Sequence, residues 1–345
     1  MKKSLLALAV LAAVAGSAQA QSNVTIYGVL DMALQNESNG ATSKGQGSIT
    51  SVDSGVQSGS RLGFKGSEDL GGGLKAIFKL EMGVNADTGS SAQGGLAFGR
   101  AAWVGLAGDF GTVKLGRQNK PMFDAVDSID PFSTGIIGGT AGQSTSATGL
   151  GNLFFATNPR SNNTINYSTN NISGFAGSVA YTFGEQAGDS SKLRGIGLSG
   201  GYAAGPLSAV IAYHSDNDAN AVAIKHTFVG ATYDFSIVKA ALSYGKVTSD
   251  NNLVDYKLWS LGGTVPVSDV AAIVGSYTRV TNNLVSSDQT GGQLGLGYTY
   301  SLSKRTNVYT SISRISNDKN SNIGGLAYAN GATERLVNVG VRHLF

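Results

Sequence analysis

The sequence has 345 residues, no cysteine, a formal net charge of +3 and a mean hydropathy of zero. The lack of cysteine excludes a disulfide scaffold and thiolate metal sites, and the small net charge gives no general attraction to nucleic acid. Glycine accounts for 49 residues, which is about twice its ordinary share. A mean hydropathy near zero fits a soluble protein, but it also fits membrane strands in which apolar and polar residues alternate.

The first twenty residues predict a secretory signal. Lys2 and Lys3 precede an apolar run over residues 5–15, and small residues at 18 and 20 form a cleavage site. The run is too short for a spanning helix, which needs about 20 apolar residues. We therefore expect residues 1–20 to be removed, which leaves a domain of residues 21–345 with two positive charges fewer.

A period of two runs through the chain. In residues 74–82, apolar side chains alternate with Lys75, Lys79 and Glu81, and a helix would scatter these charges around its axis. Sixteen segments share such a pattern. They lie near residues 23–35, 48–66, 73–84, 96–107, 110–118, 161–169, 174–184, 193–204, 206–214, 222–234, 236–247, 254–266, 268–280, 290–302, 304–316 and 334–345.

The links between these segments alternate in length. Short links such as Gly205 follow the even-numbered segments, and longer polar links such as residues 36–47 follow the odd-numbered ones. This asymmetry is typical of barrels that cross an outer membrane. The first and last segments can pair and thereby remove the free edges of the sheet. The predicted fold is therefore all-β, a 16-stranded antiparallel transmembrane β-barrel, with Tyr27 and Phe345 as aromatic anchors near the membrane boundary.

Residues 118–160 interrupt this rhythm. A segment of about forty residues without the strand pattern usually has a function when it occurs in a compact fold. We expect it to fold into the bore of the barrel.

Four motifs together resemble the trimeric general porins of the Gram-negative outer membrane, in the subgroup common among betaproteobacteria. They are SRLGFKGSEDLGGGLKAIFKLE at 60–81, FGRAAWVGLAGDFGTVKLGRQ at 98–118, RSNNTINYST at 160–169 and the terminal Phe345. The resemblance covers the whole mature chain. It implies a homotrimer in outer-membrane lipid and lipopolysaccharide, an inward-folded third loop at 119–160, and Phe345 as an assembly signal for the barrel-insertion machinery. It implies no cofactor.

Basic residues are expected on the pore wall. Arg61 and Lys65 share a face opposite Leu62 and Phe64, so they should point inward, and Arg100 should do so with Trp103 on the lipid side. The resemblance places Arg160 on the wall as well. Each arginine could instead form an ion pair in an outer loop.

Arg117 is less regular. Strict alternation from Val113 and Leu115 turns Arg117 toward lipid, where a charge costs about 2–4 kcal/mol at mid-depth. A bulge at Gly116 would reverse the alternation and bring Arg117 into the pore.

Acidic residues are expected on the loop. Asp124, Asp127 and Asp130 are three residues apart, so one or two helical turns would align them, and Pro131 would end the helix. Each aspartate could equally be a solvated loop charge. The resemblance implies that Pro131 and Phe132 form the loop tip beside the constriction.

These residues predict a water-filled channel for small hydrophilic solutes and ions, with opposed charges at its narrowest point and a weak preference for anions. A substrate-specific channel is an alternative, but it should carry a spaced row of aromatic rings. An outer-membrane barrel enzyme is a further alternative, although His214, His226 and His343 lack a catalytic frame. The Asp216–Asp218 segment lacks the acidic twelfth residue of a calcium loop. A role of the outer loops in adhesion is compatible with a pore.

Overall fold

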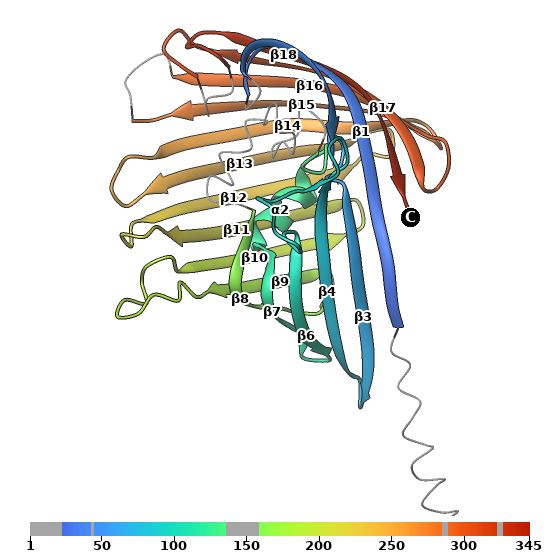
Figure 1. Ribbon diagram of the computed structural model, residues 1–345, viewed down its shortest axis with the longest axis vertical. Helices are drawn as coiled ribbons and strands as arrows, with labels where there is room; N and C mark the ends of the chain where they lie inside the picture. Colours follow the sequence, from blue (N-terminus) through green and yellow to red (C-terminus); the bar gives the residue numbers. More distant parts are fainter. Residues whose placement is uncertain (1–22, 43–44, 136–158, 285–288, 323–326) are drawn as a thin grey trace, which may run out of the picture.

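The computed structural model describes residues 23–42, 45–135, 159–284, 289–322 and 327–345. These residues are nearly all in strands, and the strands close into an antiparallel barrel (Figure 1). The strands are β1 (Asn23–Thr42), β2 (Gly45–Ser54), β3 (Arg61–Gly71), β4 (Leu74–Asn85), β5 (Ser90–Ser91), β6 (Ala101–Gly108), β7 (Gly111–Asn119), β8 (Arg160–Ser168), β9 (Phe175–Thr182), β10 (Gly195–Ala204), β11 (Leu207–Asn217), β12 (Ala223–Asp234), β13 (Lys239–Ser249), β14 (Asp255–Ser268), β15 (Ala271–Asn282), β16 (Thr290–Ser301), β17 (Thr306–Asn317) and β18 (Thr333–Leu344).

The prediction of a 16-stranded antiparallel barrel is confirmed. β2 and β3 are two parts of one barrel strand, because β2 pairs with the second half of β1 and β3 with its first half. β5 has only two residues and pairs with the end of β4. The described residues contain one helix, α2 (Pro121–Ile129), and no helix among them is long and apolar enough to cross a membrane.

The division of the second barrel strand differs from the expected continuous strand over residues 48–66. Residues 55–60 leave the sheet and turn toward Asp31 on β1. The backbone N–H of Gly55 donates to the Asp31 carbonyl at 2.8 Å, and that of Ser58 donates to Asp31 Oδ2 at 2.6 Å. Because these groups are satisfied by Asp31, the chain can bend inward at this point without leaving them unpaired.

The barrel closes where β1 pairs with β18, with Val29 opposite Leu344 at one end of the ladder and Ser38 opposite Arg335 at the other. The terminal Phe345 continues this pairing, since its N–H and C=O exchange hydrogen bonds with Gly28 at 3.1 and 3.0 Å. A side chain at Gly28 would collide with the Phe345 ring. The lack of a side chain at Gly28 therefore leaves the space that the Phe345 ring occupies.

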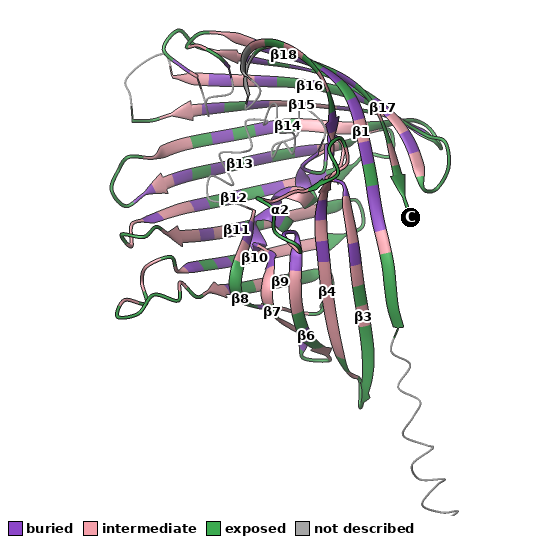
Figure 2. Ribbon diagram, viewed as in Figure 1, coloured by how far each residue is buried: buried purple, intermediate pink, exposed green. Residues whose placement is uncertain are grey.

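Exposed and buried residues alternate along many of the strands (Figure 2), and the exposed side chains of the strands are largely apolar, whereas many of the inward-facing ones are polar. On β13, Leu242 and Tyr244 are 59% and 46% exposed, whereas Ser243 between them is 7% exposed. On β15 and β16, Thr278 and Gln293 are almost completely buried. Such a surface suits an apolar surrounding with water in the bore.

Tyr27 does not serve as the expected boundary anchor. Its neighbours Val24 and Ile26 are exposed on the outside, but the Tyr27 hydroxyl donates to Glu81 Oε2 at 2.6 Å inside the barrel. The alternation of β1 places position 27 on the inner face, and the nearby Glu81 carboxylate gives its hydroxyl a partner there. His343, in contrast, is exposed near the barrel end, where its Nδ1 lies 2.8 Å from Thr306 Oγ1.

The buried hydrogen bond from Tyr309 Oη to Asp31 Oδ1, at 2.6 Å, joins β17 to β1 across the closure. We expect Tyr309→Phe to lower the free energy of unfolding by about 1–3 kcal/mol, because it leaves a buried carboxyl oxygen of Asp31 without this hydrogen bond. Urea unfolding of the protein refolded in detergent measures this loss. Tyr300→Phe is the matched control, since Tyr300 is 40% exposed on the outer face. Equal effects of the two substitutions would contradict the prediction.

Candidate functional site

The segment after β7 folds into the barrel as α2, which lies within the ring of strands (Figure 1). Pro121 stands at the start of the helix, where its missing N–H costs nothing. The apolar face of α2 packs on the inner wall of the barrel. Its buried residues are Pro121, Met122, Phe123, Ala125, Val126 and Ile129, and the wall side chains in the same cluster are Ala212, Phe228, Ala241, Leu258, Val280 and Ile315.

Glycines on the wall make room for this segment. A Cβ atom at four inward-facing glycines, one each on β10, β12, β14 and β16, would come within about 3 Å of the segment. These are Gly197, Gly230, Gly262 and Gly297, and they face Pro121, Ile129, Pro131 and Phe132 in turn. The helix can therefore occupy this position because the wall has no side chain at these four glycines.

The start of the segment is held by charge. The Lys120 ammonium forms an ion pair with Asp216 on β11, and Asp216 Oδ1 also lies 2.9 Å from His214 Nε2. Burial lowers the pKa of Lys120, and the Asp216 carboxylate opposes this shift. His226 on β12 lies opposite His214, with ring centroids 6.4 Å apart. His214 is thus a buried residue of β11 beneath the loop.

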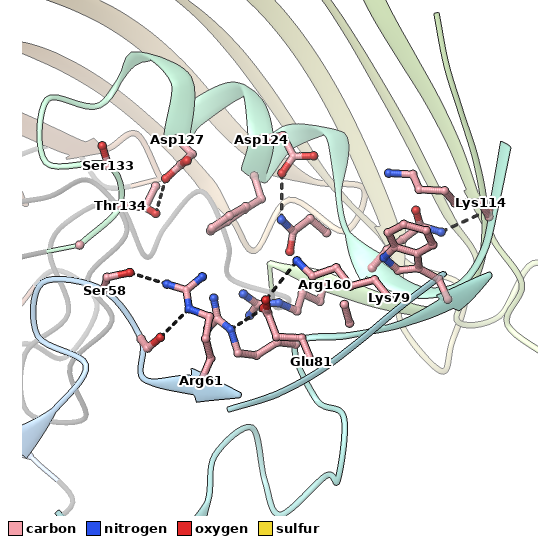
Figure 3. Close-up of a pocket in the computed structure, with 18 of the residues that line it drawn as sticks. Ser58, Arg61, Lys79, Glu81, Lys114, Asp124, Asp127, Ser133, Thr134 and Arg160 are labelled. Atoms are coloured by element: carbon pink, nitrogen blue, oxygen red, sulfur yellow. Dashed lines mark hydrogen bonds and ion pairs between the residues drawn. The ribbon is translucent and has the colours of Figure 1, made fainter. Parts of the chain in front are cut away.

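Between α2 and the opposite wall lies a cavity of about 420 Å³. Figure 3 shows aspartates of α2 on one side of it and basic side chains on the other. The basic lining residues are Arg61, Lys79, Arg100, Lys114 and Arg160, and the acidic ones are Glu81, Asp124 and Asp127. The cavity thus carries opposed charges across its width, with a net excess of positive charge.

Glu81 lies within the basic side. Its Oε1 accepts from Arg100 Nε at 2.8 Å, and its Oε2 lies 3.1 Å from Lys79 Nζ. Arg61 is held separately, because its Nε donates to the Gly59 carbonyl at 2.9 Å and its Nη2 to Ser58. The inward bend at residues 55–60 therefore positions one of the arginines of the lining.

Arg160 begins β8 and lies over the aromatic ring of Phe123, with its Cζ 5.7 Å from the ring centroid. This cation–π contact joins the basic wall to the first turn of α2.

On the acidic side, each aspartate has a partner in its own loop. Asp124 Oδ1 accepts from Asn119 Nδ2 at 2.9 Å, and Asp127 Oδ1 accepts from Thr134 Oγ1 at 2.7 Å. Asp124 is exposed toward the cavity, and desolvation of its carboxyl by the surrounding protein raises its pKa. The Asn119 hydrogen bond and the Lys114 ammonium oppose the rise.

Asp130 does not line the cavity that holds Asp124, Asp127 and the arginines. It follows the last residue of α2, and its carboxylate accepts hydrogen bonds from the N–H groups of Phe132 and Thr134, both at 3.1 Å. It lines a neighbouring cavity beside Lys239, which Asp127 also lines. The three-residue spacing does not align all three carboxylates, because the helix ends before Asp130 and the chain turns back on it.

The expected loop tip is also placed elsewhere. Pro131 and Phe132 pack against the wall at Gly262 and Gly297, and Phe132 is buried with Val56 and Tyr309. The loop residues that line the main cavity beyond α2 are Ser133, Thr134 and Gly135. Most of the expected constriction loop beyond this point, residues 136–158, lies outside the described residues.

Arg117 and Lys65 do not line the main cavity. Arg117 donates from Nε to the Gly99 carbonyl at 2.7 Å and from Nη1 to Asn162 Oδ1 at 2.6 Å. The pairing of β7 with β8 is irregular between Gly116 and Gln118, and the extra residue lies in β8, so Gln118 stays on the inner face. Lys65 faces the bore, where its ammonium lies 5.3 Å from the centre of the Tyr27 ring instead of in the lining of the main cavity.

Trp103 is not on the lipid side, and that expectation is wrong. It lines the cavity, and the Lys114 ammonium lies 5.5 Å from its ring centroid. Val104 is 59% exposed on the outside. β6 begins only at Ala101, so Arg100 precedes the strand and reaches the cavity without sharing the face of Ala102. Lys79 and Glu81 line the cavity but were not among the predicted constriction residues. The alternating pattern of β4, which places them on one face, could have indicated them.

The acidic segment after β11 forms a turn. Asp218 Oδ1 accepts from the N–H groups of Asn220 and Val222 at 2.7 and 2.9 Å. Within the described ranges, no group of three or more histidine, aspartate or glutamate side chains is arranged to hold a metal ion.

The glycine on β12 predicts how the bore responds to overpacking. In Gly230→Val, the new Cβ would lie 2.9 Å from Ile129 Cγ2. We expect α2 to be displaced into the bore, at a cost of about 1–3 kcal/mol in stability, and the conductance in planar bilayers to fall. Gly200→Val on β10 is the control, because its Cβ has no neighbour closer than 4.0 Å. An unchanged conductance in Gly230→Val would contradict this role of Gly230.

Comparison with known proteins gives a consistent result. A family model described as Gram-negative porin matches residues 7–320. Outer membrane porin protein 32 of Delftia acidovorans is 36% identical, and an outer membrane porin protein of Bordetella pertussis is 32% identical, each over 100% of both chains. The solved structure of the anion-selective porin from Comamonas acidovorans is similar with a TM-score of 0.79 and 32% identity, covering 94% of this chain and 100% of that one. With its closed barrel, apolar outside and charged bore, the chain belongs to the Gram-negative porin family of the outer membrane.

Proposed function

We propose that this porin forms a water-filled channel for passive diffusion of small hydrophilic solutes, with a preference for anions set at the cavity between α2 and the basic wall. The observation that carries this proposal is the charge of the lining, which has five basic and three acidic residues. In a narrow bore beside a low-dielectric wall, such charges act on a passing ion much more strongly than they do outside. The similar structure from Comamonas acidovorans is itself described as anion-selective.

The opposed charges also create a field across the bore. Asp124 and Asp127 lie on α2, while Arg61 and Arg160 lie on the opposite side (Figure 3). A dipolar solute would be turned by this field as it passes, and its hydration shell would be partly replaced by side chains. This supports a filter by charge and size rather than by one chemical structure.

A substrate-specific channel remains the second candidate. Trp103 and Phe123 are the aromatic residues in the described lining of the cavity, and two rings do not make a spaced row along the bore. Liposome swelling separates the candidates, because a general pore admits sugars and amino acids in order of size, whereas a specific channel saturates with one class.

Export and assembly involve the two ends of the chain, the loop and contacts between copies. We propose that residues 1–20 are a cleaved signal, that residues 119–160 form the constriction loop, and that three copies associate in the membrane. A distantly related Vibrio cholerae barrel, 18% identical, has been solved in a trimer form. Phe345 is proposed as the assembly signal, which its place at the strand end permits. Conductance steps in groups of three would support the trimer, and single independent steps would contradict it.

Removing two wall charges tests the source of selectivity. We expect Arg61→Ser/Arg160→Ser to lower the anion-to-cation permeability ratio about fivefold, if the two charges together contribute about 1 kcal/mol to anion permeation. The reversal potential in a salt gradient across a planar bilayer measures the ratio. Arg305→Ser, at an exposed turn, is the control. A ratio that does not change would remove Arg61 and Arg160 from the filter.

The raised pKa of Asp124 predicts a dependence on pH. A carboxyl whose pKa is raised takes up its proton above the ordinary value of about 3.9. Its negative charge is therefore lost at a higher pH than that of an ordinary aspartate, and the preference for anions should increase as the pH is lowered. In Asp124→Asn, the preference should be higher at pH 7 and should change less with pH. Parallel pH profiles of the two proteins would contradict the role of Asp124.

A further inference from the structure

Glu81 is a carboxylate built into the basic side of the filter. It is 3% exposed, and its two oxygens contact Arg100, Lys79 and the Tyr27 hydroxyl at 2.8, 3.1 and 2.6 Å. The two aspartates of the lining stand across the cavity on α2 and bind Asn119 and Thr134 of their own loop. Glu81 is therefore the acidic residue of the described lining that is bound directly to basic side chains of the wall.

This arrangement matters for anions that carry two or more charges. A pore must attract an ion strongly enough to admit it but weakly enough to release it. An arginine cluster without a carboxylate binds phosphate and carboxylate groups tightly, because guanidinium groups match them in charge and shape. The Glu81 carboxylate is already bound to Arg100 and Lys79, so a passing anion has to compete with it for these basic groups.

We propose that Glu81 determines specificity by preventing the arginine cluster from retaining multivalent oxyanions, such as phosphate, sulfate and small polycarboxylates, so that they pass instead of lodging. The inference rests on the proposed preference for anions and assigns a role to the lining carboxylate that is paired with Arg100 and Lys79. Glu81 sets the residence time of the anion, while the arginines set its attraction.

Glu81→Gln tests the inference, because it keeps the shape of the side chain and removes its charge. The measurement is the single-channel current of the full-length protein in 0.1 M KCl with increasing inorganic phosphate at neutral pH. We expect phosphate to interrupt the current of the variant at concentrations about tenfold lower than in the wild type, since one opposing charge near the arginines is gone. The anion-to-cation ratio in KCl alone should rise.

Glu68→Gln is the matched control. Glu68 is exposed near the end of β3, so the substitution removes the same charge outside the cavity. Because Glu81 is buried, a pair of variants with Arg100 removed gives a second test. Arg100→Gln retains Glu81, and Arg100→Gln/Glu81→Gln removes both members of the ion pair. We expect the double variant to bind phosphate more tightly than Arg100→Gln.

The results separate this inference from the proposed function. If the wild type prefers cations, the proposed anion preference fails and the role of Glu81 fails with it. If the wild type prefers anions, but Glu81→Gln and the double variant bind phosphate no more tightly than their parents, the inference about Glu81 alone is overturned.

Discussion

A strand that crosses an apolar layer must find partners within the protein for every backbone N–H and C=O group. This chain meets the requirement by pairing β1 with β18 and by continuing that pairing to Gly28 and Phe345. Because the sheet has closed, alternate side chains can divide between an apolar outside and a polar inside. The contrast between Leu242 and Ser243 on one strand illustrates this division. The bore, and any site within it, exists only as a result of the closure.

The inner surface is not uniformly polar, and this difference creates the filter. One part of the wall is apolar. There Gly230 and Phe228 pack against Ile129 and the rest of the apolar face of α2. The helix therefore packs on one side of the bore and leaves its aspartates facing the other. Arg61 and Arg160 lie on that other side, so the same packing that orders the loop brings opposite charges together.

The alternating pattern predicted most strands to within a few residues and predicted an inward direction for Arg61. It failed where a strand is interrupted, because the alternation from one residue to the next holds only along continuous extended backbone. Residues 55–60 leave the sheet, and β6 starts at Ala101 instead of near residue 96. Trp103 was assigned to the wrong face for this reason. The irregularity near Arg117 was anticipated at Gly116, but its extra residue lies in β8.

Sequence reasoning alone predicted the all-β class, the number of strands, the charged face of β4 and a helical segment before Pro131. These depend on neighbours along the chain, and local periodicity records them. Three features were not predicted and were found in the folded barrel: Asp130 turns back into its loop, Pro131 and Phe132 pack on wall glycines, and Glu81 stands among the basic residues. The contacts of Pro131, Phe132 and Glu81 join segments that are distant in the sequence, and these segments meet only once the barrel has closed around α2. The turn at Asp130 is held by local hydrogen bonds, which the spacing of the aspartates does not record.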